Sequence, residues 1–452
     1  MTDREQNRFT ARASRYARVG ANMGGVAARI AGSALAGRSG DADRRNAAAL
    51  TAALGGLKGP LMKVAQLLAT IPEALPAEYA EELKALQSEA PPMGALFVRR
   101  RMAAELGPDW AAKFAEFERE PAAAASLGQV HRAWLADGTR LACKLQYPDM
   151  ESAVEADLKQ LGLVFALHRQ FTSAIDTREI REEIGARIRE ELDYVREARH
   201  AALYAEMLAG EPLIRVPRVL PALSTRRLLT MEWLDGEKIL AFKTAPAEIR
   251  NRLATAMFRA WWHPFSHYGV IHGDPHLGNY TVFRTAEGEP GGINLLDYGC
   301  IRIFPPTFVG AVVDLYRGLL EGDEARIVHA YETWGFRRLN RAMIDVLNIW
   351  ARFIYGPLLD DRTRTIADGV SPGQYGRKEA ARVHQALKET GPVTIPREFV
   401  FMDRAAIGLG GVFLHLDAEL NFFRLFNAEI ADFSTRTVAA RQADALSRAG
   451  LA

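Results

Sequence analysis

Two short motifs constrain this chain more than any other feature of its sequence. Residues 272–279 read HGDPHLGN, and after an apolar run the chain reads INLLDYG, which ends at Gly299. Transfer of a phosphoryl group needs a carboxylate near the attacking oxygen, and it needs an amide and a second carboxylate to hold magnesium against the phosphates. Asp274, Asn279 and Asp297 offer these groups in that order. The motifs therefore predict a nucleotide as the bound molecule.

Length and composition bound the class of protein. A chain of 452 residues is too long for one small core, so two or three domains or one two-lobed domain are expected. The net charge of +2 gives no basic field that would indicate nucleic-acid binding. The two cysteines, Cys143 and Cys300, are too few for a disulfide scaffold and fit a reducing compartment. We expect Cys300 to be a small buried hydrophobic residue.

The first forty or so residues are rich in arginine and alanine. Their arginines recur every three or four positions and would share one side of a helix, namely Arg4, Arg8, Arg12, Arg15 and Arg18. This side could be a solvated face, a membrane-surface helix or part of a transit peptide, and Asp3 and Glu5 disfavour the transit peptide. No stretch approaches the roughly 18 apolar residues of a membrane-spanning helix. We expect a cytoplasmic protein without a transmembrane segment, with any contact to the inner face of a membrane made peripherally by this segment.

Strand-like patterns occur early in the chain and helical patterns late. A hairpin turn is expected at Asp137-Gly138. Several short helices are expected over 58–115 and long helices over 150–210. From Pro246 onwards mostly helix is expected, apart from the motif region 270–303 and a Gly/Pro/Arg-rich loop near 356–377. The expected strands are residues 126–131, 133–135, 141–145, 216–219 and 228–231. This order predicts an α+β protein with two lobes.

Lys144, in ACKLQYP, ends one of the predicted strands. In kinase-like folds a lysine at this place binds the α- and β-phosphates and is held by a helical glutamate. A lysine on an exposed strand is the ordinary alternative, but the later motifs favour the phosphate role. An acidic run, EELDYVREA, offers candidate partners. It could be a solvated face, or one glutamate could pair with Lys144 while the others face the nucleotide or the metal.

The segment AAAASLGQVH precedes Lys144 where a protein kinase has a glycine-rich loop over the phosphates. Alanine restricts φ where glycine does not, so we expect a stiffer loop that approaches the phosphates differently. The residues expected to contact them are Ala123, Ala124, Ala125 and Ser126. An alanine run alone is more often a helix or a linker. Farther on, MEWLDG is similar to a hinge between lobes, which places Glu232 and Leu234 beside the adenine.

Together these segments resemble the UbiB/AarF/ADCK family of atypical kinases. The resemblance rests on AAAASLGQVHRA, ACKLQYP, ELDYVREA, and HGDPHLGN followed by DYG. It also includes a helix of the family's KxGQ type, here Lys63-Val64-Ala65-Gln66. It covers roughly residues 58–305 and departs from the family pattern at Ala65, which stands for glycine, and at Leu277, which stands for proline.

The resemblance implies a bilobal protein-kinase-like fold with an N-terminal helical extension of the KxGQ type and a mostly helical C-lobe. The implied domains are an Arg/Ala-rich segment, the KxGQ-like extension, an N-lobe with inserted ExD helices, and a C-lobe with the catalytic loop and DYG. Their bounds are residues 1–57, 58–115, 116–235 and 236–452.

Residue roles follow from the resemblance. Lys144 would bind the phosphates of ATP, and Glu197 would be its salt-bridge partner. Asp274 would be the catalytic carboxylate, and Asn279 and Asp297 would bind Mg²⁺. A regulatory group would occlude the place of a peptide substrate, and it consists of Lys63, Gln66, Glu191 and Asp193.

The implied function is that of a magnesium-dependent ATPase or kinase that supports ubiquinone (isoprenoid-quinone) or other lipid metabolism, with a lipid or quinone precursor as partner. The implied protein is not a conventional protein kinase. Two alternatives stay open. One is a small-molecule phosphotransferase of the aminoglycoside-phosphotransferase type, which shares HGDxHxxN. The other is a non-catalytic, nucleotide-gated binding module.

Overall fold

The computed structural model describes residues 94–368 and 397–452, apart from Ser126, Asp149, Arg338 and positions 153, 156–157, 159–184 and 187. The Arg-rich segment and the segment expected to form the KxGQ-type helix, with Lys63 and Gln66, lie outside the described residues. The chain divides into two compact units. The first runs to Ala198 and includes Val219–Trp233, and the second comprises Arg199–Arg218 and Leu234–Ala452.

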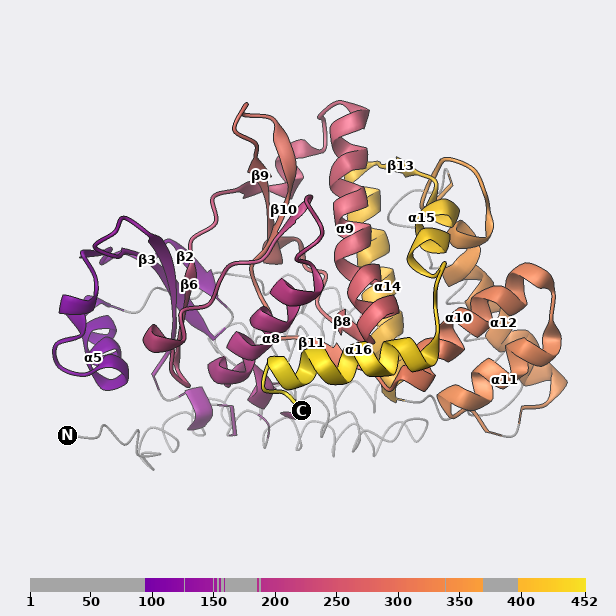
Figure 1. Cartoon of the computed structure of the whole chain (residues 1–452), viewed down its shortest axis with the longest axis horizontal. Coiled ribbons are helices and arrows are strands. Elements are labelled where there is room, and N and C mark those ends of the chain that lie inside the picture. The colour runs from indigo at the N-terminus through magenta and orange to yellow at the C-terminus, as the bar shows by residue number, and fades with distance from the viewer. Residues whose placement is uncertain are drawn as a thin grey trace, which may run out of the picture. The chain divides into compact units, whose positions relative to one another are not determined.

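The first unit is an antiparallel sheet with a helix packed on it (Figure 1). Its strands follow the order β1-β3-β4-β6, and β2 also pairs with β3. The elements are α5 (Ala95–Leu106), η1 (Trp110–Lys113), β1 (Glu116–Phe117), β2 (Ala123–Ala125), β3 (Gly128–Trp134), β4 (Arg140–Gln146), η2 (Pro221–Leu223) and β6 (Leu228–Glu232). The alanine run is therefore a strand and not a helix or linker.

The hairpin expected at Asp137-Gly138 joins β3 to β4. Gly138 has φ +84, which an L side chain rarely adopts, and the Thr139 amide donates to Asp137 Oδ1 at 2.9 Å. Apolar side chains of α5, among them Val98 and Met102, share a core with those of β4 and β6. This core fixes one face of the strand that carries Lys144.

A buried polar network also fastens α5 to the sheet. The guanidinium of Arg101, which is 5% exposed, donates to the backbone oxygens of Gln146 at 3.2 Å and of Tyr147 at 3.3 Å. Glu105 accepts from Arg227 Nε at 2.7 Å and from Thr225 Oγ1 at 2.6 Å. These bonds hold α5 against the end of β4 and the turn before β6.

The second unit is mostly helical, as the pattern after Pro246 predicted. Its sheet order is β5-β10-β9-β7, with separate pairs β11-β8 and β12-β13. Its strands and short turns are β5 (Ile214–Arg215), β7 (Glu237–Lys238), η3 (Ile239–Phe242), β8 (Val270–His272), η4 (Leu277–Asn279), β9 (Tyr280–Arg284), β10 (Pro290–Leu295), β11 (Ile301–Ile303), η5 (Gly356–Leu359), β12 (Arg364–Thr365) and β13 (Glu419–Leu420).

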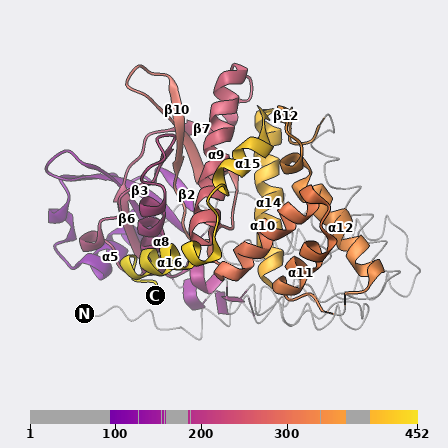
Figure 2. The same ribbon diagram turned by 45° about the vertical axis from the view of Figure 1, so that its right-hand side comes forward.

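One long helix organises this unit. Helix α9 (Ala247–Tyr268) buries side chains at helical spacing, such as Met257, Trp261 and Phe265, and α14 lies beside it in Figure 1. Gly269 ends α9 in the left-handed conformation, with φ +66. The remaining helices are α10 (Pro306–Glu321), α11 (Glu324–Trp334), α12 (Arg341–Tyr355), α14 (Arg397–Leu416), α15 (Phe422–Glu429) and α16 (Thr435–Arg448). Figure 2 shows α10, α11 and α12 grouped together.

Within the described residues, one helical stretch, Arg341–Leu359, is long and apolar enough to cross a membrane. A core helix meets the same criterion, and polar groups of this stretch bind neighbours in the protein. Arg341 forms an ion pair with Glu324 of α11 at 2.9 Å, and Asn348 accepts from the Tyr331 hydroxyl at 2.9 Å. These contacts are typical of an amphipathic helix on a protein core.

Three expectations from the sequence were wrong. A strand was expected over 216–219, but the strand is Ile214–Arg215, and Val219 forms only an isolated bridge. Pro217 explains the shift, because it has no amide hydrogen for a sheet. Two strands were expected on either side of Arg132, but β3 is continuous through it. Cys300 was expected to be buried, but it is half-buried, and Cys143 is the buried cysteine.

Candidate nucleotide and metal site

Lys144 and Glu197 form a buried ion pair in the first unit. Lys144 Nζ lies 2.6 Å from Glu197 Oε1, and their side chains are 11% and 3% exposed. The ammonium also lies 5.2 Å from the centre of the Tyr194 ring, within the range of a cation–π contact. The pairing of Lys144 with Glu197 is the one expected from the sequence. A lysine held in this way presents a fixed charge that suits a phosphate.

Strand β3 approaches β4 closely at one position near Lys144, which is Gly128. Lys144 pairs with Val130 of β3 and with Leu229 of β6. A Cβ atom at Gly128 would lie 2.1 Å from the backbone oxygen of Leu145. Gly128 pairs with Gln146, two residues after Lys144, and is therefore required for the close approach of β3 to β4 there.

The alanine segment enters the same sheet. Ala123 and Ala124 pair with Val130 and Gln129. Ala125 pairs with Gly128, and Ser126 at the turn lies outside the described residues. A backbone held by ladder hydrogen bonds is stiffer than a free glycine loop, in line with the stiffness expected from the alanines.

A buried polar pair in β3 was not expected from the sequence. Gln129 Nε2 lies 2.7 Å from His131 Nε2, and His131 Nδ1 lies 2.9 Å from the Glu118 backbone oxygen. Burial lowers the pKa of His131, which favours the neutral ring. The sequence shows Gln129 and His131 as two polar residues in a predicted strand, but it does not indicate which face of the sheet they occupy.

The acidic run that was expected to face the site has divided roles. Asp193 Oδ1 accepts from the amides of Val195 and Arg196, both at 3.1 Å, so Asp193 caps the start of α8 (Tyr194–Met207). The cap explains why the helix expected over the whole acidic run breaks before Tyr194. Glu191 is half-buried. The role of Glu191 and Asp193 in occlusion stays a prediction.

In the second unit, His272 fixes the shape of the HGDPHLGN loop. Its Nε2 donates to the Asp297 backbone oxygen at 2.7 Å, and its Nδ1 accepts from the Asp274 amide at 3.1 Å. These partners fix a single tautomer, with the proton on Nε2. The Trp261 indole of α9 donates to the His272 backbone oxygen at 2.9 Å. His272 thus connects the HGD turn to the DYG turn by hydrogen bonds.

Asp274 and Asn279 lie within hydrogen-bond distance of each other. Asn279 Nδ2 donates to the Asp274 backbone oxygen at 3.0 Å and approaches its Oδ2 at 3.3 Å. Because the amide nitrogen is used here, Asn279 presents its oxygen as the acceptor. His276 Nδ1 accepts from the Gly278 amide at 3.1 Å, so it shapes the loop.

Asp297 lies at the start of the DYG turn. Its Oδ1 accepts from the Gly299 amide at 3.0 Å, which orients the carboxylate. β8 pairs with β11, and the Gly273 amide donates to the Cys300 oxygen at 2.7 Å. The two motifs recognised in the sequence therefore come together in this unit.

Helix α14 packs against the HGDPHLGN loop, and the sequence did not indicate this contact. A Cβ atom at Gly408 would lie 2.2 Å from Pro275 Cγ. Pro275 follows Asp274 directly, and its backbone oxygen accepts from the Tyr280 hydroxyl at 2.5 Å. The missing side chain at Gly408 thus lets α14 pack directly on the residue after the catalytic aspartate candidate.

The donor set fits magnesium. Asn279 and Asp297 offer an amide oxygen and a carboxylate, and Mg²⁺ prefers hard oxygen ligands, of which one or two from protein suffice when phosphates supply others. The Lys144–Glu197 pair fits a nucleotide phosphate. The hinge candidates Glu232 and Leu234 stand where β6 ends, and the chain leaves the first unit after Trp233.

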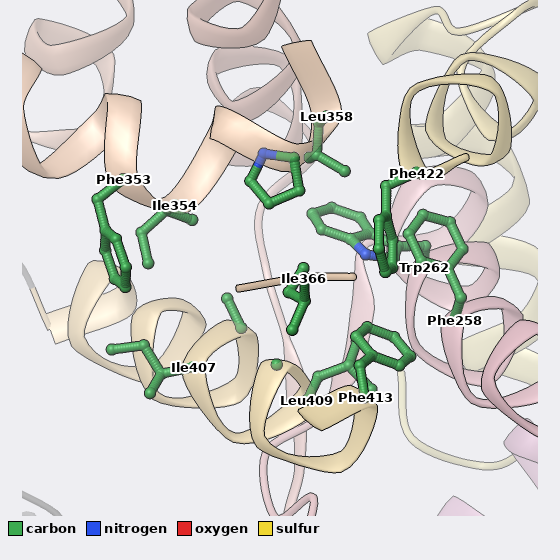
Figure 3. A pocket seen from close by; sticks show the side chains of 13 residues that line it. Phe258, Trp262, Phe353, Ile354, Leu358, Ile366, Ile407, Leu409, Phe413 and Phe422 are labelled. Atoms are coloured by element: carbon green, nitrogen blue, oxygen red, sulfur yellow. The ribbon is translucent and has the colours of Figure 1, made fainter. Parts of the chain in front are cut away.

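A pocket elsewhere in the second unit has different chemistry. Figure 3 shows Phe258 and Trp262 of α9 lying beside Phe422 of α15, with Phe413 of α14 and Leu358 on other sides. Its lining residues are apolar, so they offer no ligand to phosphate or magnesium. The pocket contains none of the motif residues.

Comparison with known proteins gives the family. Residues 85–331, more than half of the chain, match the ABC1 atypical kinase-like domain. Similar curated proteins include an uncharacterised protein of Synechocystis sp., 31% identical over 80% of this chain and 61% of the relative. AarF domain-containing protein kinase 1 of Xenopus laevis is 30% identical over 60% of this chain and 52% of the relative. The mitochondrial atypical kinase COQ8 of Saccharomyces cerevisiae is 30% identical over 56% and 50%.

The chain thus spans about half to three-fifths of the length of these relatives. Among solved structures, the complex of Rv3197 with erythromycin from Mycobacterium tuberculosis has a TM-score of 0.58 and 26% identity, and the match covers 83% of this chain and 93% of that one. This likeness confirms an α+β fold of the kinase-like kind. The chain belongs to the ABC1 atypical kinase-like proteins, the UbiB/AarF/ADCK family.

Proposed function

We propose that this protein binds ATP with magnesium and cleaves the γ-phosphate, as an atypical kinase or ATPase that supports isoprenoid-quinone or other lipid metabolism. The observation that carries the proposal is the hydrogen-bond network from His272 to Asp274, Asn279 and Asp297. It holds two carboxylates and one amide in one loop region, which is the set that phosphoryl transfer requires.

Each residue of the set has a role in the proposed reaction. Asp274 orients the attacking hydroxyl or water and accepts its proton. Asn279 and Asp297 hold magnesium, which when bound neutralises charge on the phosphates. Lys144, fixed by Glu197, holds the phosphates of the nucleotide. The stiff strand β2 keeps the backbone of Ala123 and Ala124 close to them.

We further propose that the protein does not act as an ordinary protein kinase. Lys63 and Gln66, with Glu191 and Asp193, would occlude the place where a peptide would bind. The family resemblance supports this arrangement, and Ala65 in place of glycine adds one methyl group to the occluding helix. Water or a small acceptor would then receive the phosphoryl group.

The lipid context of the proposal rests on the relatives. The yeast relative is named an atypical kinase, COQ8, and is mitochondrial, and the family includes kinase-like proteins of ubiquinone biosynthesis. A cytoplasmic protein whose Arg-rich N-terminal segment meets the inner face of a membrane would reach such substrates. Anionic lipid attracts basic helices of this kind.

ATP turnover by the purified protein tests the proposal. It is measured with magnesium, with and without vesicles of anionic phospholipid and a soluble quinone-precursor phenol. We expect turnover that vesicles or phenol increase, and its loss in Asp274→Asn. Turnover that is unaffected by both additions would contradict the lipid role, and absence of turnover in every condition would contradict the catalytic role and favour the nucleotide-gated binding module.

Phosphorylation of a soluble small molecule is the second candidate. The motif HGDPHLGN fits it equally well, and the similar solved structure contains a small molecule, erythromycin. Stoichiometric transfer of phosphate from ATP to a hydrophilic acceptor such as an aminoglycoside, detected by mass spectrometry, would favour this candidate over the lipid role.

A further inference from the structure

A cluster of two histidines and a glutamate contains none of the residues of the proposed ATP site. His263 and His267 lie one turn apart on α9, and Glu429 is the last residue of α15. The two imidazole rings stack with their centres 4.2 Å apart. Glu429 Oε2 lies 3.2 Å from His263 Nδ1 and 3.7 Å from His267 Nδ1. Three potential ligands thus converge from two helices.

We propose that His263, His267 and Glu429 bind a transition-metal dication such as Zn²⁺, at a site that joins α9 to α15. Two histidines four residues apart on a helix, with a carboxylate from a second element, are a recurring ligand set for zinc. The proposal concerns a site independent of the magnesium ligands Asn279 and Asp297. It does not depend on the proposed function.

The distances are close to those that a tetrahedral site requires. Ligand atoms about 2.1 Å from a zinc ion are about 3.4 Å from one another in a tetrahedron. The two distances to Glu429 Oε2, 3.2 and 3.7 Å, lie on either side of this value. All three ligand atoms lie within 4.8 Å of one another. Three protein ligands leave the fourth position to water.

The three side chains of the cluster are half-buried. The side chains of His263 and His267 are 23% and 26% exposed and that of Glu429 is 10% exposed, so an ion can enter from solvent. Burial lowers the pKa of His267, and the neighbouring His263 lowers it further, although Glu429 and a backbone hydrogen bond raise it.

Other neighbours oppose or compete with the metal. Arg441 of α16 also lowers the pKa of His267, and its charge would repel a cation. His267 Nδ1 lies 2.9 Å from Ser266 Oγ and 3.2 Å from the His263 backbone oxygen. A metal that binds His267 Nδ1 must displace these bonds. Alternatively, the metal binds His267 Nε2 while Nδ1 stays hydrogen-bonded to the backbone, which is a common arrangement for a zinc-bound histidine. We therefore expect a moderate affinity, in the micromolar range on the order of 10⁻⁶ M.

A metal here would have a structural consequence. Trp262 of α9 packs edge-on against Phe426 of α15, with ring centres 4.8 Å apart, next to the proposed site. Trp262 and Phe422 also line the apolar pocket in Figure 3. Coordination across α9 and α15 would fasten this packing, so the ion would stabilise the helical unit. The alternative is a plain ion pair between His263 and Glu429.

The test uses the full chain without a polyhistidine tag, stripped of metal with a chelator. Binding of Co²⁺ is followed by its visible absorption, and Zn²⁺ is measured by competition. We expect the protein to bind Co²⁺ at this site with an absorption that indicates nitrogen ligands and that Zn²⁺ abolishes. His267→Ala and Glu429→Gln should each weaken the affinity by about tenfold or more, because each removes a ligand. His329→Ala, an exposed histidine on α11, is the matched control and should bind like wild type.

A second readout separates loss of the site from loss of folding. Zn²⁺ should raise the thermal transition of the wild type and of His329→Ala, but not that of Glu429→Gln, whose side chain keeps its shape. Equal metal affinities in wild type, His267→Ala and Glu429→Gln would overturn the proposal. So would a failure of the wild type to bind Co²⁺ or Zn²⁺ at concentrations well above micromolar.

Discussion

Replacing Lys144 with methionine removes the ammonium that faces the buried Glu197 carboxylate. The two charged atoms lie 2.6 Å apart and the Glu197 side chain is only 3% exposed. At an effective dielectric constant of about 20, a pair at this distance interacts by about 6 kcal/mol. Desolvation offsets part of this gain, and removal of one partner from a buried pair typically costs about 3–5 kcal/mol. We expect Lys144→Met to destabilise the first unit by that amount, in the absence of nucleotide.

Hydrogen exchange of peptides from β4 and α8 measures the effect locally, because the two units need not unfold together. The double variant Lys144→Met with Glu197→Leu removes both charges and should recover a large part of the loss. Lys113→Met, at an exposed lysine of the same unit, is the control and should change stability by less than about 0.5 kcal/mol. A cost of Lys144→Met below about 1 kcal/mol, or a double variant no more stable than the single one, would refute the reasoning.

Two further predictions follow from close contacts at glycines, and a third follows from the burial of a cysteine. Gly408→Ala places a methyl group against Pro275 and should lower ATP turnover by displacing the HGDPHLGN loop. Gly411→Ala on the same helix meets no neighbouring atom within 4 Å and should leave turnover unchanged. Equal turnover rates in the two variants would contradict a role of α14 in supporting the loop. Gly128→Ala should destabilise the sheet by about 1–3 kcal/mol in urea unfolding, because its Cβ would meet the Leu145 backbone; wild-type stability would contradict it. Burial raises the pKa of the Cys143 thiol to about 12, so this thiol should react slowly at pH 8. Alkylation at pH 8, followed by mass spectrometry, should therefore modify the half-buried Cys300 first. Modification of Cys143 before Cys300 would contradict this prediction.

The elements that the sequence predicted best are those with short-range causes. The Asp137-Gly138 turn and the alternating strands on either side of it specify a hairpin locally. The spacing from His272 to Asn279 likewise places its groups within one loop. These features needed no knowledge of distant parts of the chain.

Features that depend on distant parts were predicted less well. Periodicity did not distinguish Glu197 from the other acids of its run, and the family resemblance selected it. The strand before Pro217 was misplaced because its partner, β10, lies far along the chain. Three further features join segments that lie far apart in the sequence. They are the network of Arg101 and Arg227, the contact of Gly408 with Pro275, and the approach of Glu429 to two histidines. No local sequence pattern predicts such contacts.

The most direct test of the central claim is the affinity for an ATP analogue with magnesium and with a chelator. For the wild type we predict that magnesium raises the affinity. In Asp297→Asn, which keeps the size of the side chain but lacks the charge, this increase should disappear. Asp314→Asn, on α10 and outside the DYG turn, should behave like wild type. A magnesium-dependent affinity in Asp297→Asn equal to that of the wild type would contradict the assignment of this site.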